Sequence, residues 1–337
     1  MERPFCAFCY ASSDKLLKCG QCLQRLYCSA ECQRNDWKTK PGGGCHKLYC
    51  GIAGEINVDY EIKDTGKDGV GVGVFALREF DKNDMILTER PILKVVERQL
   101  VSHNINEIPK TAAPLFESLL PVDGRFQQKW DKNAMDCTGE EDAKKESGLF
   151  LVLSRINHDC LGNADHQYLA HRGIKILVAA KHIPKGHEIT ISYLGSFKPK
   201  HERNIRLLSY PFHFICRCDV CTNDELDQKL ARTKDLDRAI LTLGAKGKIE
   251  VAMRKGRALL SLYEQLQQST WLYQRTYYDL FQVAITKKKY YKDAMHFMEK
   301  AHEAALAYTQ DPQHPQVLRL QELLISPETH RNYRIIG

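Results

Sequence analysis

Eight residues of the kind that bind zinc fall in close pairs within the first fifty positions, and this feature limits the fold more than any other. Two thiolates on one tight turn can occupy adjacent corners of a tetrahedron, so four such pairs supply two closed sites with no open position for water. Fifty residues with little apolar content cannot form a core alone, and each zinc would contribute on the order of 10 kcal/mol to folding. The module is therefore predicted to bind partners and not to catalyse. Its pairs are Cys6-x2-Cys9, Cys19-x2-Cys22, Cys28-x3-Cys32 and His46-x3-Cys50.

The cysteine count and the start of the chain indicate the compartment. There are 13 cysteines, an odd number, and most lie in short C-x-C, C-x2-C or C-x3-C pairs. This pattern is typical of zinc sites in a reducing compartment and not of a disulfide framework. The first residues lack the apolar segment of a signal peptide, and nowhere do about eighteen apolar residues run together. We therefore expect a monomer in the cytoplasm, the nucleus or both, without a membrane segment.

Charge is distributed unevenly along the chain. The formal balance is +4 over residues 1–50, −4 over residues 51–227 and +7 over residues 228–337. Basic ends suit acidic partners or nucleic acid. No block of five like charges occurs, so solvated surface lysines are the favoured explanation.

Residues 51–227 have the pattern of a β-rich domain that is interrupted by a helical segment. Residues 98–150 are more polar and helical and are predicted to form the insertion. From about Leu226 the pattern is helical, with apolar residues at three- and four-residue spacing. Short runs of strand-forming residues between Gly- and Asp-rich turns predict strands at Asn57–Ile62, Val70–Leu77, Met85–Thr88, Ile92–Val96, Lys175–Ala180 and Glu188–Tyr193.

The segment from Gly71 to Ala76 matches the dinucleotide-binding pattern G-x-G-x-x-A. That motif requires a strand before it and a helix that opens within it. Here a turn precedes the glycines, and the short, turn-rich segment Arg78–Asp84 follows. The context excludes a Rossmann site and leaves a glycine-rich start of a strand as the plain structural alternative.

Several motifs in a fixed order carry a family resemblance. The paired ligands, together with Tyr27-Cys28 and Asp36-Trp37, resemble a MYND zinc finger. The G-x-G segment, Asn157-His158-Asp159-Cys160, the run from Gly186 to Tyr193 (GHEITISY) and Cys216-x-Cys218-x2-Cys221 resemble the SET domain of the SET-and-MYND methyltransferases. The motifs cover residues 1–221, and the remainder is similar more weakly. The resemblance implies an α+β protein with a finger at 1–50, a SET domain at 51–209, a post-SET segment at 210–225 and a helical, tetratricopeptide-like domain at 226–337.

The resemblance also implies three zinc sites. MYND fingers pair their ligands crosswise, and the post-SET cysteines supply only three thiolates, to which this family adds the cysteine of its N-H-x-C motif. Cys45 is an alternative to Cys50 that the spacing disfavours, and Cys137 is left over. The implied sites are Cys6, Cys9, Cys28 and Cys32; Cys19, Cys22, His46 and Cys50; and Cys160, Cys216, Cys218 and Cys221.

The activity that the resemblance implies is transfer of a methyl group from S-adenosylmethionine to a lysine of a histone or another protein. Tyr193 would place its hydroxyl near the reacting amine. Aromatic side chains would line the lysine channel: Phe212, Phe214 and, upstream, Tyr210. The residues expected to contact the cofactor are Gly71, Val72, Gly73, Asn133, Asn157, His158, Tyr193 and Phe214.

Two residues depart from the family pattern, and the second departure, at Phe212, supports an alternative. Asp159 replaces the usual serine, and Phe212 stands where the family has tyrosine. An inactive or weakly active scaffold that recruits partners through the finger is therefore the competing hypothesis. MYND fingers commonly bind proline-rich peptides and sometimes contact DNA, and the sequence does not choose between these partners.

Overall fold

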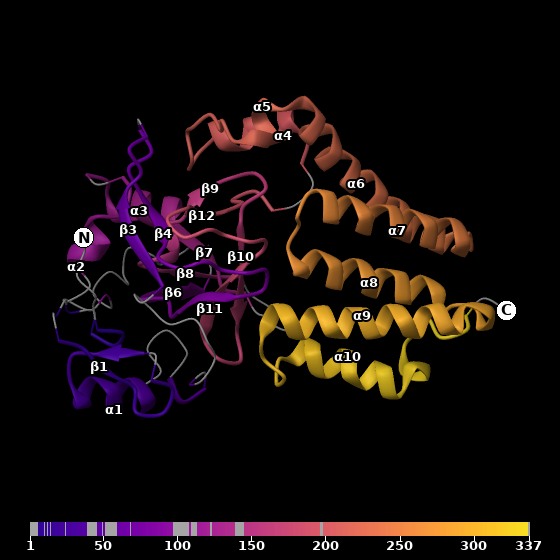
Figure 1. Ribbon diagram of the computed structural model, residues 1–337, viewed down its shortest axis with the longest axis horizontal. Coiled ribbons are helices and arrows are strands. Elements are labelled where there is room, and N and C mark those ends of the chain that lie inside the picture. The colour runs from indigo at the N-terminus through magenta and orange to yellow at the C-terminus, as the bar shows by residue number, and fades with distance from the viewer. Residues whose placement is uncertain are drawn as a thin grey trace. The chain divides into compact units, whose positions relative to one another are not determined.

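The computed structural model of the chain divides into two compact units (Figure 1). The first contains Met1–His158, Gly162–Ile191 and Ser209–His213, and the second contains Asp159–Leu161, Ser192–Leu208 and Phe214–Gly337. Within the described part of the chain, no helix is both long enough and apolar enough to cross a membrane. The structure describes residues 6–9, 11, 13, 15–23, 25–38, 46–48, 50, 59–67, 69–96, 108, 113–121, 123–138, 145–195 and 198–335.

The first unit begins with a small finger. Strands β1 (Leu17–Lys18) and β2 (Leu26–Tyr27) form an antiparallel hairpin, and helix α1 (Ala30–Lys38) and the 3-10 helix η2 (His46–Leu48) follow. Its buried side chains include ligand cysteines together with polar groups such as Arg25 and Asp36. Ligands and ion pairs therefore occupy the place that an apolar core would hold in a larger domain.

Three small sheets form the β-rich part of the first unit. The strands β5 and β11 are buried along their whole length, and most of their residues are apolar, with Thr88, Glu89 and Lys175 as buried polar exceptions. The first sheet has the order β3 (Tyr60–Asp64), β4 (Val72–Ala76), β12 (Glu188–Ile191) and β9 (Asn157–His158). The second has the order β10 (Ala164–Leu169), β11 (Ile174–Ala179) and β5 (Met85–Glu89), and the third β6 (Leu93–Val96), β8 (Glu146–Leu149) and β7 (Ala134–Asp136).

The predicted strands are present with shifted ends, whereas the predicted helical insertion is only partly right. The start of the first predicted strand, residues 57–58, lies outside the described residues. Helices α2 (Ala113–Glu117) and α3 (Phe126–Asn133) fall in the insertion, but β7 and β8 form an antiparallel pair there. Strand β8 also pairs with β6. Pairing on both sides stabilises a strand whose own sequence has weak β-propensity.

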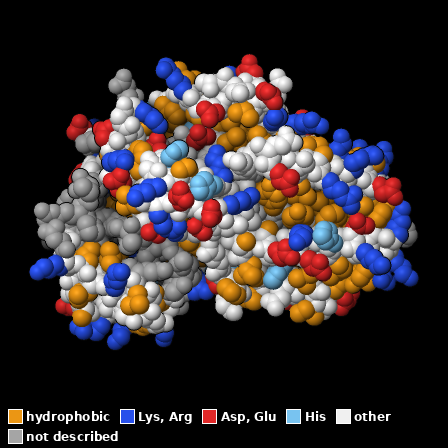
Figure 2. All heavy atoms as spheres, in the orientation of Figure 1, with side chains coloured by type: hydrophobic (Ala, Val, Ile, Leu, Met, Phe, Trp, Pro, Cys, Tyr) orange, Lys and Arg blue, Asp and Glu red, His pale blue; other side chains and the backbone are white. Residues whose placement is uncertain are grey.

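The second unit is helical, as the spacing of apolar residues predicted. It contains α4 (Lys200–Leu208), α5 (Asp219–Thr222), α6 (Asp224–Ala245), α7 (Ile249–Gln265), α8 (Thr270–Ala284), η7 (Lys288–Tyr290), α9 (Tyr291–Thr309), α10 (Pro315–Ile325) and η8 (Pro327–Thr329). Consecutive helices from α6 to α10 run side by side with short reversals between them (Figure 1). Leu259, Tyr263, Ala294 and Met298 are all buried. Lys and Arg side chains gather toward the end of this unit that carries the C-terminus (Figure 2).

Candidate zinc centres and cofactor site

The structure groups twelve ligand residues into three clusters. In each cluster the four ligand atoms all lie within 4.8 Å of one another. Cys45 lies outside the described residues, and Cys50 joins the second cluster. The clusters are Cys6, Cys9, Cys28 and Cys32; Cys19, Cys22, His46 and Cys50; and Cys160, Cys216, Cys218 and Cys221.

Distances within the clusters fit tetrahedral zinc. With Zn–S bonds of about 2.3 Å, the sulfur atoms at two corners of a tetrahedron lie roughly 3.8 Å apart. The Sγ–Sγ distance is 3.5 Å between Cys9 and Cys28 and 4.0 Å between Cys19 and Cys50. The Sγ atom of Cys22 lies 3.5 Å from Nε2 of His46, close to the roughly 3.6 Å expected of a sulfur–nitrogen edge. These donor sets suit structural zinc with no position open to water.

The histidine of the second cluster is held in the form that binds metal. Burial lowers the pKa of His46 to about 3, and the positive charge of Arg25 acts in the same direction. The ring is fully buried and packs edge-on against Trp37, with 5.7 Å between ring centroids. A neutral imidazole has a free lone pair, so this environment favours ligation.

A buried ion network joins the finger to the β-rich part of the first unit. The Asp36 carboxylate lies 2.7 Å from Nε of Arg25 and 2.6 Å from an Nη of Arg90, the residue that follows β5, and it accepts a 2.7 Å hydrogen bond from the Tyr27 hydroxyl. Both guanidinium groups also donate to the carbonyl of Ala7. Burial raises the pKa of Asp36, but the two arginines and Tyr27 outweigh it, and the net pKa is lowered. The carboxylate is therefore ionised and forms ion pairs with both arginines.

The third cluster has its own compensating cation within the second unit. Its Cys160 Sγ lies 3.9 Å from Cys216 and 3.5 Å from Cys221. The buried Arg203 of α4 donates to the sulfur of Cys221 at 3.5 Å and to Asp227 of α6 at 2.7 Å. Four thiolates around Zn²⁺ carry a net charge of −2, and a buried guanidinium offsets part of it. Arg203 therefore links the cluster to the first long helix.

Sheet order brings three separate motifs together in the first unit. Strand β12 lies between β4, which carries the G-x-G segment, and β9, which carries Asn157 and His158. The β12–β9 pair is parallel, with Thr190 opposite Asn157 and Ile191 opposite His158. Residues far apart in the chain therefore become neighbours because their strands share one sheet.

The side chain of Asn157 is oriented by its neighbours. Its Nδ2 donates to the Val72 carbonyl at 3.0 Å and to Oε1 of Glu188 at 2.7 Å. The other carboxylate oxygen of Glu188 lies 2.8 Å from Nζ of Lys67. Because both hydrogens of the amide are used, its oxygen remains as the acceptor that Asn157 offers to a ligand.

The two glycines of the G-x-G segment are required for different reasons. Gly71 has a φ of +76°, a conformation that glycine adopts readily, and a Cβ there would meet nothing within 4 Å. A Cβ at Gly73 would lie 2.6 Å from Glu188 Oε1 and 3.0 Å from Asn157 Nδ2. In this structure Gly73 thus makes room for the side chains that orient Asn157.

A buried carboxylate holds the segment that leads to Asn157. Glu89, the last residue of β5, accepts hydrogen bonds from the backbone N–H groups of Leu151, Val152 and Leu153 at 2.6, 3.0 and 2.9 Å. Burial raises the pKa of Glu89, and these donors partly offset that effect. Glu89 thus holds the segment before Asn157, and the adjacent Arg90 binds Asp36 of the finger.

Other predicted site residues of the first unit have structural partners. The Nδ2 atom of Asn133 donates to the carbonyls of Leu120 and Lys129, and its carbonyl accepts from Ser154 Oγ at 2.9 Å. The hydroxyl of Tyr210 donates to the carboxylate of Asp131. Both side chains therefore stabilise α3 and its surroundings.

The remaining predicted residues are divided between the units. His158 and Phe212 belong to the first unit, and Tyr193 and Phe214 to the second. All four are partly exposed. The placement of the Tyr193 hydroxyl near the reacting amine, and of the aromatic side chains along the lysine channel, stays a prediction. Sequence reasoning assigned no role to Glu188, Lys67, Glu89 or Arg203, although Glu188 lies inside the GHEITISY run.

Comparison with known families agrees with this geometry. The SET domain profile matches residues 71–194, and the MYND finger profile matches residues 6–50. The chain is a SET and MYND domain protein, a relative of the SMYD family. In this SMYD relative the whole finger match precedes the SET match.

Curated relatives of this SET and MYND protein are N-lysine methyltransferases. The chain is 25% identical over 249 residues to SMYD2 of Bos taurus, 24% over 248 residues to SMYD2 of Homo sapiens and 26% over 239 residues to SMYD2-B of Xenopus laevis. These matches cover 69, 68 and 66% of this chain and 54, 53 and 52% of the relatives. The chain thus spans about half the length of the curated relatives it matches.

Proposed function

We propose that the protein is an S-adenosylmethionine-dependent protein-lysine N-methyltransferase that holds three structural zinc ions. The observation that carries the proposal is the arrangement of Gly73, Glu188 and Asn157 in one sheet, which leaves the Asn157 amide oxygen as an acceptor. The cofactor has an ammonium group, which requires such an acceptor, and the sheet belongs to a SET domain. When bound, S-adenosylmethionine supplies the methyl group on a positively charged sulfur.

Residues of this chain would then position and desolvate the lysine. A free lysine has a pKa of about 10.4, and only its neutral form has a lone pair that can attack. An apolar channel lowers that pKa because it disfavours the charged form. Phe212 and Phe214 would contribute such walls and attract the ammonium by cation–π contact. The Tyr193 hydroxyl would accept from the amine and orient its lone pair toward the methyl group.

The test compares residues that bind the cofactor with one that acts at the reacting centre. Asn157→Ala should weaken cofactor binding about tenfold or more, because it removes a hydrogen bond to a charged group. Tyr193→Phe should reduce turnover roughly 10²-fold while cofactor affinity stays nearly constant, because its hydroxyl matters mainly in the transition state. Calorimetry gives the affinity, and labelled-methyl transfer to a peptide library or lysate gives turnover.

Controls separate these effects from misfolding. Both variants should retain three zinc ions and a cooperative melt. Absence of cofactor binding by the fully zinc-loaded wild type would refute the proposal. Equal turnover of Tyr193→Phe and wild type would refute the assignment of Tyr193 alone.

A scaffold that binds partners through the finger is the second candidate. Phe212 lacks the hydroxyl of the family's tyrosine, and the upstream Tyr210 hydroxyl is bound to Asp131. Wild type that binds cofactor and a proline-rich peptide, but transfers no methyl group to any lysate protein, would support the scaffold. Phe212→Tyr should change the rate or the number of methyl groups added if the enzyme is active. Histone and non-histone lysines in cytoplasm or nucleus are the proposed substrates, and DNA is the other proposed finger ligand.

A further inference from the structure

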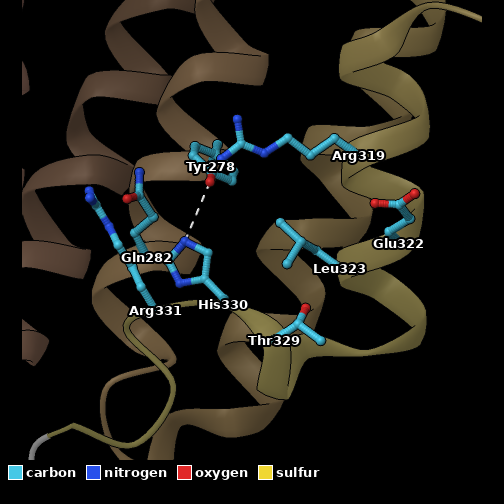
Figure 3. A pocket seen from close by; sticks show the side chains of 8 residues that line it. All are labelled: Tyr278, Gln282, Arg319, Glu322, Leu323, Thr329, His330 and Arg331. Carbon is cyan, nitrogen blue, oxygen red and sulfur yellow. Dashed lines mark hydrogen bonds between the residues drawn. The ribbon is translucent and has the colours of Figure 1, made fainter.

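A cavity opens in the helical unit, and none of its lining residues is named in the proposed activity. It has a volume of about 560 Å³. Its walls come from Tyr278 and Gln282 of α8, Arg319 and Leu323 of α10, and Thr329–Arg331 after α10 (Figure 3). A volume of this size is in the range of small-ligand pockets and exceeds what one small ion needs.

Two exposed arginines line this cavity, and neither has a counter-ion in the part of the chain that the structure describes. Arg319 and Arg331 reach it from different segments, and among the described residues neither guanidinium forms an ion pair (Figure 3). The acidic lining residue Glu322 follows Arg319 by three positions, but its carboxylate points away from that guanidinium (Figure 3). Burial lowers the pKa of His330, and the charges of Arg331 and Arg319 lower it further, which favours the neutral ring. The lining therefore carries a net positive charge.

The floor of the cavity supplies a neutral donor in a defined orientation. The Nδ1 atom of His330 accepts a 3.1 Å hydrogen bond from the backbone N–H of Asn332. A neutral histidine that accepts at Nδ1 carries its proton on Nε2, and this atom lies 3.4 Å from the hydroxyl oxygen of Tyr278. The tyrosine oxygen accepts a hydrogen bond from this N–H, which leaves the tyrosine O–H as a donor for a ligand. The lining thus includes two arginines and one hydroxyl donor.

Basic side chains continue beyond the cavity rim. The backbone N–H of Arg334 donates to the carbonyl of Ile285 at 3.0 Å, so the chain end lies against the turn that carries Lys287–Lys289. This end of the unit is the one where Lys and Arg gather in Figure 2. Such a field favours a ligand with more than one negative charge.

We propose that this cavity binds the phosphate group of a phosphorylated peptide. Phosphate carries a charge of about −1.5 to −2 at pH 7 and has three acceptor oxygens. Because these oxygens are arranged tetrahedrally, they can accept hydrogen bonds from donors on several sides of the cavity, whereas a carboxylate is planar. The space beyond one phosphate accommodates the neighbouring peptide. The rings at the floor are already packed: Tyr278 stacks on Phe281 with centroids 6.1 Å apart, and His330 packs edge-on against Phe281 at 5.2 Å. A nucleic acid would require open rings for base stacking, so a peptide is favoured.

The test uses the full zinc-loaded chain and fluorescence anisotropy with three labelled probes. These are a degenerate phosphoserine peptide pool, the same pool without phosphate, and a single-stranded oligodeoxythymidine. The phosphorylated pool should bind, the unphosphorylated pool should bind at least about tenfold more weakly, and the oligonucleotide should not displace the phosphorylated pool. Arg319→Gln/Arg331→Gln should lose about tenfold affinity per arginine, because each removes a charge-assisted contact.

A matched variant removes the same charge elsewhere. Arg232 of α6 and Arg254 of α7 are exposed and do not line the cavity, so Arg232→Gln/Arg254→Gln should bind like wild type. Unchanged thermal melts of both double variants exclude a folding defect. Equal binding of the two peptide pools, equal losses in the two double variants, or displacement by the oligonucleotide would each overturn the proposal. These outcomes do not bear on the proposed methyltransferase activity, because the cavity shares no residue with the proposed catalytic site.

Discussion

The buried network around Asp36 predicts an asymmetry between two substitutions. One carboxylate, fully buried, contacts two arginines that are 1% and 3% exposed. Removal of one partner from a buried pair typically costs about 3–5 kcal/mol, because it leaves an uncompensated charge. Asp36→Asn leaves two cations uncompensated, so we expect a loss near the upper end of that range, about 5 kcal/mol.

Arg90→Met should cost much less. It removes one of the two cations and leaves Asp36 paired one-to-one with Arg25 and hydrogen-bonded to Tyr27. The carbonyl of Ala7 keeps the donor from Arg25. Methionine also fills part of the space with an apolar chain, so we expect a loss below about 2 kcal/mol.

Urea unfolding and zinc release measure this difference. Trp37 packs on the ligand His46, so its fluorescence reports on the finger, and a chromogenic chelator reports on released zinc. Glu303→Gln, in an exposed pair with Lys300, is the matched surface control and should leave both signals unchanged. If Asp36→Asn destabilises no more than Arg90→Met, the reasoning from uncompensated charge is wrong.

Three further predictions concern the other parts of the chain. Cys160→Ser should release about one zinc equivalent per chain, measured by metal analysis, because three thiolates cannot close the tetrahedron; full retention would exclude the third site. Burial raises the pKa of Asp279 to about 6, so its charge opposes folding as pH rises from about 4 to 6. Asp279→Asn should therefore be more stable than wild type at pH 7.5, by at most about 3 kcal/mol, and equally stable near pH 4 in denaturant melts. Gly256→Ala should lower the melting temperature, because its Cβ would lie 2.4 Å from Leu280 Cδ2; an unchanged melt would show that Leu280 yields freely.

The paired zinc ligands depend on local spacing, so the sequence alone predicts them. Spacings such as Cys6-x2-Cys9 place two thiolates on one turn without help from the rest of the chain, so the paired ligands and the need for metal follow directly. Helical spacing in the last hundred residues likewise predicted the helices, in which apolar residues such as Leu259 and Met298 are buried. The order of the motifs carried the family resemblance.

Only the tertiary structure revealed the contacts between residues that lie far apart in the sequence and belong to no recognisable motif. Glu89 and Arg90 are adjacent in the chain, yet one binds the segment before Asn157 and the other binds Asp36 of the finger. Glu188 orients Asn157 because β12 lies between β4 and β9, an order that no propensity encodes. The weak strands of residues 134–149 were missed for the same reason. Pairing and ion networks depend on which distant partners folding brings together, and a linear pattern records only near neighbours.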